Sequence, residues 1–320
     1  MMKYLAGLVV VGVLVAAGFA VFSFQTYRTP YVAADTAIVI ARGTGGRAML
    51  QQLHTQGVLP APWKILLPIV LSGQQGQFKA GEYQFVQGLT PQQVVATIVK
   101  GEVIVHSVTI PEGWSVAQAR AILLKEPLLE GDLPAAIAEG SLAPDTVHFS
   151  RGDSRASIIR RLQNRQRAIL SAAWMHRADD LPLASPEQAL VLASIVESET
   201  GIEAERRRVA AVYINRLRQG MALQADPTVA YGVAPQGMTR ALSRADLARD
   251  TPYNTYLHPG LPPGPICNPG QASIAAALNP LPSDELFFVA TGHGGHWFAK
   301  SAAEHARNVA RYRAALRAAR

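Results

Sequence analysis

The sequence predicts an α+β fold behind one N-terminal transmembrane helix. Residues 5–24 contain no charged side chain, which predicts the membrane-spanning helix. Short β-branched runs alternate with capped helical segments in residues 36–110, which predicts a small α/β domain. Two apolar helical segments in residues 185–219 and a hairpin pattern in residues 286–299 predict a larger mixed α+β domain with a small antiparallel sheet.

The transmembrane prediction rests on length and on flanking charge. An α-helix of about 20 residues covers roughly 30 Å, the thickness of the hydrocarbon core of a bilayer. A signal peptide has a shorter apolar stretch and a small-residue cleavage site, which residues 18–20 do not offer. Lys3 precedes the run on a short tail, so we expect the N-terminus in the cytoplasm. Residues 1–30 are thus predicted to be the tail, anchor and stalk of a single-pass inner-membrane protein whose C-terminal bulk lies in the periplasm.

Composition excludes several classes of function. The net charge of +7 comes from scattered basic side chains without interleaved aromatics, so we expect a solvated basic surface and no nucleic-acid partner. The single cysteine, Cys267, excludes a disulfide framework and a four-cysteine zinc site. His293 and His296 are close in sequence but have no evident third ligand, so we expect no metal and no cofactor.

Residues 31–107 are predicted to form the small domain. We predict strand, helix, strand, helix and strand, in that order, at residues 36–40, 47–56, 79–85, 90–100 and 102–110. Thr90 and Gln93 form a capping-box pattern that starts the second helix. The order of elements resembles a LysM-like module, a type that binds N-acetylglucosamine polymers. A spacer domain without a ligand is the alternative.

Residues 108–320 are predicted to form the larger domain. Its most informative helix starts at residues 185–188, where a serine cap, a proline and a capping-box glutamine occur together. Residues 189–196 are apolar around the whole circumference, so this helix should be buried. It ends in two carboxylates, Glu197 and Glu199, that project to different sides at about 100° per residue. The Glu197 side carries the smaller residues, which predicts room for a ligand there.

Polar residues on the following segments are candidate sugar ligands. A second apolar helix at residues 203–219 ends in polar side chains. The loops at residues 223–228 and 253–265 combine tyrosine, asparagine and threonine with proline and glycine, a composition that suits carbohydrate. A rigid surface loop without a ligand is the alternative. His296, in the predicted hairpin, is a further candidate for a hydrogen bond to a ligand.

Six ordered motifs closely resemble the endolytic murein transglycosylases of the YceG-like type. They are LASIVESET at 192–200, VYINRL at 212–217, MALQADPTVAYG at 221–232, YNTY at 253–256, GLPPGPI at 260–266 and GHWF at 295–298. The order of one anchor, a LysM-like domain and a final larger domain is also similar. The resemblance implies an enzyme that cuts peptidoglycan strands between N-acetylmuramic acid and N-acetylglucosamine and leaves 1,6-anhydro ends. Peptidoglycan synthases are its candidate partners.

The resemblance assigns the acid/base role to Glu197, which is followed by Ser198 where many family members carry lysine. We hypothesise that apolar surroundings keep Glu197 protonated, so that it donates to the leaving oxygen and later takes the proton of the C6 hydroxyl. Candidate substrate-binding residues are Ser198, Asn215, Arg216, Gln224, Asp226, Thr228, Tyr253, Asn254, Thr255, Tyr256 and His296. Backup acids are Glu199, Glu203 and Glu205.

Two other classes of protein remain open from the sequence. A membrane-anchored, non-catalytic glycan-binding or scaffold protein would not need the Glu197 motif. A hydrolase with the same anchor would be either a two-carboxylate muramidase or a peptidase. A peptidase would need a nucleophile beside His258, His293 or His296, and no serine elbow accompanies them.

Overall fold

The computed structural model describes residues 2–318, and within them the chain divides into two compact units. The first unit contains the residues up to His106 together with His148–Gly152. The second contains Ser107–Val147 and the residues from Asp153 onward. Helices and strands are mixed in both units and every sheet has two strands, which confirms the predicted α+β class.

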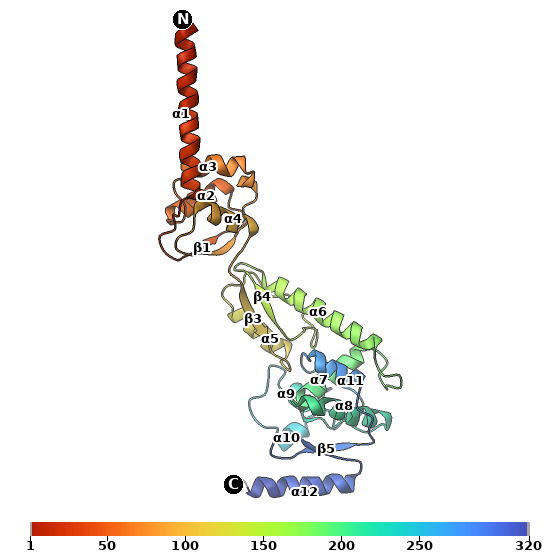
Figure 1. Ribbon diagram of the computed structural model, residues 1–320. Coiled ribbons are helices and arrows are strands. Elements are labelled where there is room, and N and C mark those ends of the chain that lie inside the picture. The colour runs from red at the N-terminus through yellow and green to blue at the C-terminus, as the bar shows by residue number, and fades with distance from the viewer. Residues whose placement is uncertain (1, 319–320) are drawn as a thin grey trace. The chain divides into compact units, whose positions relative to one another are not determined.

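The first unit begins with the long apolar helix α1 and continues into a small mixed domain (Figure 1). Its elements are α1 (Met2–Arg28), β1 (Thr36–Ile40), α2 (Gly46–Thr55), α3 (Pro62–Leu71), the 3-10 turn η1 (Gln74–Gly76), β2 (Gly81–Phe85) and α4 (Pro91–Lys100). Strands β1 and β2 pair antiparallel, with Ile38 opposite Tyr83. Thr90 and Gln93 form the predicted capping box at the start of α4. Ile38, Tyr83 and Leu53 of α2 are fully buried at the centre of this unit.

Two features of the fold differ from the expectation. Helix α3 was not predicted, because Pro68 lies inside it and its apolar residues show no helical pattern. The strand predicted at residues 102–110 is shorter, β3 (His106–Ile110), and it pairs with β4 (Asp145–Phe149) instead of joining β1 and β2.

The second unit is mainly helical. Its remaining elements are α5 (Val116–Lys125), α6 (Arg155–Met175), α7 (Pro186–Glu199), α8 (Glu203–Arg218), α9 (Asp226–Val233), α10 (Arg244–Leu247), α11 (Gln271–Leu278), β5 (Phe287–Ala290), β6 (His296–Ala299) and α12 (Ala302–Ala318). The predicted starts of α5 and α6 are confirmed by caps at Ser115 and Ser154. Helix α7 packs against α6, α8, α9 and α11, so it is the central helix of the unit.

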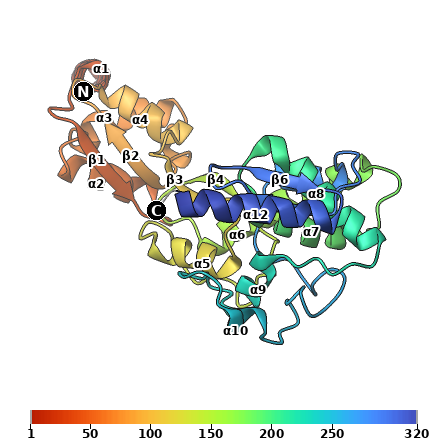
Figure 2. The ribbon, with the colours of Figure 1, turned by 90° about the horizontal axis from the view of Figure 1, so that it is seen from below.

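The C-terminal hairpin predicted near residue 290 is confirmed. Strands β5 and β6 pair antiparallel, with Phe288 opposite Phe298. Helix α12 packs on both strands, and Figure 2 shows it running alongside the hairpin. Strand β5 also contacts α8, the helix that follows α7 in the chain.

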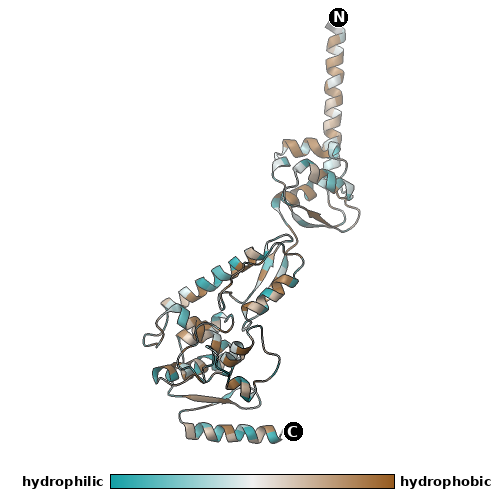
Figure 3. Ribbon diagram, turned by 180° about the vertical axis from the view of Figure 1, so that it is seen from behind, coloured by the Kyte–Doolittle hydropathy of each residue, from teal (hydrophilic) through white to brown (hydrophobic). Residues whose placement is uncertain are grey.

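Helix α1 is long and apolar enough to cross a membrane. Tyr4–Arg28 has a mean hydropathy of 2.7, its apolar residues colour much of the ribbon brown in Figure 3, and most of them are exposed. Among residues 2–318, no other helix meets the criteria of length and hydropathy for a membrane span.

Candidate active site

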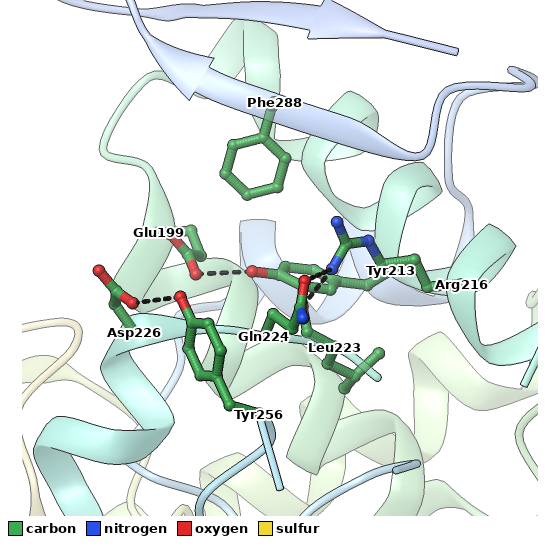
Figure 4. Close-up of a pocket in the computed structure, with 8 residues that line it drawn as sticks. All are labelled: Glu199, Tyr213, Arg216, Leu223, Gln224, Asp226, Tyr256 and Phe288. Carbon is green, nitrogen blue, oxygen red and sulfur yellow. Dashed lines mark hydrogen bonds between the residues drawn. The ribbon is translucent and has the colours of Figure 1, made fainter. Parts of the chain in front are cut away.

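The C-terminal end of α7 opens into a polar pocket within the second unit. Glu199, the last residue of α7, lies at its edge. Figure 4 shows carboxylate, phenol, guanidinium and amide groups turned toward this space, with the ring of Phe288 on one side. The pocket has a volume of about 190 Å³ and is lined by Glu199, Tyr213, Arg216, Leu223, Gln224, Asp226, Tyr256 and Phe288.

The sequence positions Glu199 by making α7 a buried helix with defined ends. The Ser185 side chain accepts a hydrogen bond from the N–H of Gln188 and fixes the start of the helix. Residues 191–196 are all buried in the main core of the unit. Thr200 ends the helix as its C-cap. Because the apolar run ends just before Glu199, this carboxyl emerges at the edge of the core.

The Glu199 carboxyl is enclosed by protein and is hydrogen-bonded to Tyr213. The Tyr213 hydroxyl donates to Oε1 of Glu199 at 2.6 Å. Burial raises the pKa of Glu199 to about 7 and the charge of Asp226 adds to the rise, while the Tyr213 hydrogen bond and the charges of His296 and Arg216 oppose it. Burial also raises the pKa of Tyr213 well above its usual range, so its hydroxyl stays a donor. A carboxyl with this pKa can both give and take a proton near neutral pH.

A second tyrosine–carboxylate pair lines the same pocket. The Tyr256 hydroxyl donates to Oδ1 of Asp226 at 2.6 Å. Burial and the hydrogen bond to Asp226 raise the pKa of Tyr256 above its usual range. Asp226 begins α9, and Tyr256 lies in the loop that follows α10. The Tyr256 residue is 36% exposed, so it presents an amphipathic surface to a ligand.

Arg216 holds the loop that carries Gln224. Its buried guanidinium donates to the carbonyl oxygens of Ala222 and Leu223 at 3.1 and 2.8 Å, and to that of Leu286 at 2.7 Å. These bonds connect the loop to the start of the hairpin. Gln224 has φ +52°, and it is the one non-glycine residue with positive φ among residues 2–318. Such a conformation costs energy and is often found at functional sites.

The C-terminal hairpin completes the pocket through Phe288. On α8, Glu205 accepts a hydrogen bond from the backbone N–H of His296 at 3.0 Å and lies 2.7 Å from its Nδ1. The Phe288 ring contacts His296 and Tyr213 edge-on, with centroid distances of 5.3 and 5.8 Å. The Glu205–His296 contact therefore fixes the hairpin against α8 and keeps Phe288 at the pocket.

Glu197 lies outside this pocket and has polar partners of its own. Its Oε2 accepts a hydrogen bond from the backbone N–H of Gly270 at 2.9 Å, and its Oε1 lies 3.9 Å from the Arg206 guanidinium. Both oxygens of Glu197 therefore face donors, while its side chain is only 6% exposed, and its acid/base role stays a prediction. The N-cap of α11, Gly270, lies against the Glu197 side of the helix, and a neighbouring hollow of about 230 Å³ is lined by Gly113 and Ser198.

Five of the predicted substrate-binding residues lie outside the pocket and support its walls. Asn215 and Asn254 are buried, and each donates to two backbone carbonyls. Thr228 and Thr255 are buried and hydrogen-bonded to each other at 2.9 Å. Tyr253 packs against the main core. These side chains position the loops that carry Asp226, Gln224 and Tyr256.

The other candidates are dispersed around α7 and α8. Ser198 lines a neighbouring hollow of about 230 Å³, and Glu203 is exposed on the first turn of α8. Glu205 contacts His296 rather than the pocket. Within residues 2–318, no group of three or more His, Cys, Asp or Glu side chains is placed to hold a metal ion.

Three residues that line the pocket were not among the candidates. Tyr213 and Leu223 belong to motifs that were singled out, Tyr213 as part of an apolar helix and Leu223 as the first residue of a polar loop. Phe288 lies 89 positions after Glu199, and no sequence pattern links the two. The polar hydroxyl of Tyr213 within an otherwise apolar helix is the one signal that could have identified it.

Solved structures and curated relatives agree on one family. The chain is 28% identical over 306 residues to the endolytic murein transglycosylase of Bacillus subtilis, covering 86% of this chain and 84% of that protein. It is 28% identical over 282 residues to the endolytic murein transglycosylase of Streptococcus pneumoniae D39, covering 73% of this chain and only 50% of that protein.

A crystal structure of a YceG-like protein from Listeria monocytogenes also matches, with a TM-score of 0.53 and 27% identity. The match covers 86% of this chain and 99% of the Listeria chain. The model of the YceG-like family matches residues 38–311, which include every residue of the pocket. The chain therefore belongs to the YceG-like family.

Proposed function

We propose that this protein is an endolytic peptidoglycan lytic transglycosylase in which Glu199 is the general acid and base. The observation that carries the proposal is the enclosed Glu199 carboxyl, with a pKa raised to about 7, at the edge of a polar pocket. A general acid works best when its pKa is near the working pH. The relatives named endolytic murein transglycosylases support peptidoglycan as the substrate.

In the proposed reaction, protonated Glu199 donates its proton to the glycosidic oxygen between N-acetylmuramic acid and N-acetylglucosamine. The C1–O bond breaks, and the acetamido oxygen of the substrate bonds to C1. The Glu199 carboxylate then takes the proton of the C6 hydroxyl, whose oxygen displaces the acetamido oxygen at C1. The product is a 1,6-anhydro end, and Glu199 is protonated again. The Tyr213 hydroxyl stabilises the carboxylate between the two steps.

The polar groups around Glu199 are suited to hold a sugar chain. Gln224 and Tyr256 offer amide and hydroxyl groups, and Arg216 fixes the loop that carries the amide. Asp226 is a second carboxylate in the pocket, and an ordinary glycosidase needs two. The Asp226 carboxylate is engaged by Tyr256, so we assign it a positioning role and give the proton transfers to Glu199.

The N-terminal part supports a role close to the membrane. We propose that α1 anchors the protein in the inner membrane as a single span, with the bulk of the chain in the periplasm, where peptidoglycan is assembled. The strand–helix–helix–strand order of residues 36–85 supports a LysM-like, glycan-binding role for the small domain. Synthases that produce new glycan strands are the proposed partners.

Purified full-length protein in detergent, incubated with peptidoglycan sacculi, tests the proposal. We expect mass spectrometry to detect 1,6-anhydro products with the wild type, and Glu199→Gln to lose roughly 100-fold or more of their rate. Glu197→Gln, the same substitution on the same helix, is the matched control and should keep activity within about tenfold. An active Glu199→Gln enzyme together with an inactive Glu197→Gln enzyme would return the acid role to Glu197.

The nature of the products separates the other functions. Reducing ends without anhydro sugar would show a muramidase, with Asp226 as the second carboxylate. Glycan binding without any released product would show a binding or scaffold protein. Either outcome contradicts the transglycosylase proposal.

A further inference from the structure

Helix α3 is apolar on two opposite sides. Its inner side places Ile65 and Ile69 in the core of the first unit, where both are fully buried. Its outer side exposes Trp63, Leu66 and Val70, whose residues are 58%, 45% and 42% accessible. A helix with apolar residues on all sides is typical of a buried or membrane-contacting element. The apolar outer side of α3 is therefore exposed in water and needs an apolar environment to cover it.

Helix α3 is attached to α1 by specific contacts. Pro68 lacks the N–H that would bond to the carbonyl oxygen of Lys64 four residues earlier. The hydroxyl of Ser23 in α1 donates to this carbonyl at 2.7 Å, and Ser23 is fully buried. The Trp63 ring stacks beside Phe19 and Phe22 of α1, with centroid distances of 6.4 and 6.3 Å.

These contacts fix the depth of α3 relative to the apolar run of α1. Phe19, Phe22 and Ser23 all lie within residues 5–24, the uncharged stretch. At a rise of 1.5 Å per residue, Phe22 is about 3 Å and Phe19 about 7 Å from the end of this stretch. Insertion of the whole stretch into a bilayer therefore carries Trp63 to the boundary between hydrocarbon and headgroups.

We propose that α3 is an interfacial helix, with the surface formed by Trp63, Leu66, Val70 and Leu71 in contact with the lipids of the bilayer that α1 spans. This inference rests on the proposed anchoring by α1. The chemistry agrees with the location, because tryptophan is enriched at membrane–water interfaces. Apolar side chains on one face of an interfacial helix enter the boundary between headgroups and acyl chains. The Lys64 ammonium lies 5.5 Å from the centroid of the Trp63 ring, where headgroup phosphates would be found.

The consequence is a fixed placement of the first unit at the membrane. A protein held only by α1 and a stalk would sample many distances and orientations. With α1 and α3 both in the bilayer, the first unit lies against the membrane surface. Its β1–β2 sheet and α4 are then presented to glycan strands close to the membrane.

Depth-dependent quenching of Trp63 fluorescence tests this placement. The chain has four tryptophans, so the other three, Trp114, Trp174 and Trp297, are replaced by phenylalanine. The full chain is reconstituted in nanodiscs whose lipids carry bromine either near the headgroup end or near the methyl end of the acyl chains. We expect bromine near the headgroups to quench Trp63 roughly twofold more than deep bromine. Aqueous acrylamide should have little effect.

A second reporter separates failure of α3 from failure of the anchor. Leu14→Trp, in a chain without the four native tryptophans, reports on the middle of α1 and should be quenched by deep bromine. Quenching of this reporter with Trp63 quenched only by acrylamide would overturn the interfacial placement and leave the anchor intact. If neither tryptophan is quenched by lipid, both proposals fail.

Matched substitutions check that the outer side of α3 is responsible. Leu66→Glu should shift Trp63 emission to longer wavelength and reduce its quenching by lipid. Val86→Glu, at a residue of similar exposure in the same unit, should leave both unchanged. Equal effects of the two substitutions would contradict a specific role of α3.

Discussion

The raised pKa of Glu199 makes a prediction about stability as well as about activity. A carboxyl whose pKa rises on folding holds its proton more tightly in the folded state, so it favours folding at low pH. This contribution is lost as the pH rises from the ordinary value of 4.5 to about 7. One pKa unit corresponds to about 1.36 kcal/mol, so ionisation of Glu199 should cost the folded state about 3 kcal/mol above pH 8.

Glu199→Gln removes this cost because the amide cannot ionise, while its oxygen can still accept the hydrogen bond of Tyr213. Relative to the wild type, the variant should therefore become more stable as the pH rises from 4 to 8. For a domain of this size, about 3 kcal/mol corresponds to roughly 6–12 °C in Tm. Thermal unfolding of the full-length protein in detergent, followed by intrinsic fluorescence at several pH values, measures the difference.

Glu187→Gln is the control. It makes the same substitution on the same helix, but its change in stability at neutral pH should have the opposite sign. The hydrogen bond from Ser185 lowers the pKa of Glu187, so its ionised form favours folding. This control should lose a little stability at neutral pH. Curves of Tm against pH that run parallel for Glu199→Gln and the wild type would refute the reasoning about Glu199.

Three further substitutions probe the pocket. Tyr213→Phe removes the hydrogen bond that opposes the high pKa of Glu199, so the alkaline limb of the pH–rate profile should move upward; an unchanged profile would contradict this. Gln224→Gly relieves a positive φ that costs about 1 kcal/mol or more, so the Tm should not fall. The rate of formation of 1,6-anhydro products should fall, because the pocket loses the Gln224 side chain. A lower Tm would show that this φ is not strained. Asn254→Ala removes the three hydrogen bonds of a fully buried side chain and should cost about 3 kcal/mol. Because Tyr256 would lose its position, activity should fall by more than the lower Tm explains, and unchanged kinetics would contradict this.

Local sequence signals predicted where helices start more reliably than which other elements pack against them. Ser185 and Thr90 identified the starts of α7 and α4, because a cap and its partner lie only three residues apart. Helix α3 was missed because its stability depends on contacts with α1, 41 residues away at the Ser23–Lys64 hydrogen bond. Propensity and periodicity carry no information about such a contact.

The choice between Glu197 and Glu199 shows the same limit within the site. Both carboxylates end the same buried helix, and the sequence shows that they point to different sides. Which side is open depends on Gly270 at the start of α11 and on Phe288 in the hairpin. Both lie more than 70 positions downstream, so only the folded chain can distinguish the two glutamates. The motifs nevertheless include the helix and the loops that line the pocket.

The late position of Phe288 also affects how the protein comes to be active during its synthesis. Glu199 and Tyr213 emerge well before the segment that encloses them. A chain whose residues 287–299 have not yet been synthesised contains the proposed acid, Glu199, but lacks the contacts of the hairpin. A growing chain should therefore not cleave the cell wall until β5 and β6 have folded onto α8. The order of the elements along the chain thus makes the proposed activity appear only after synthesis is nearly complete.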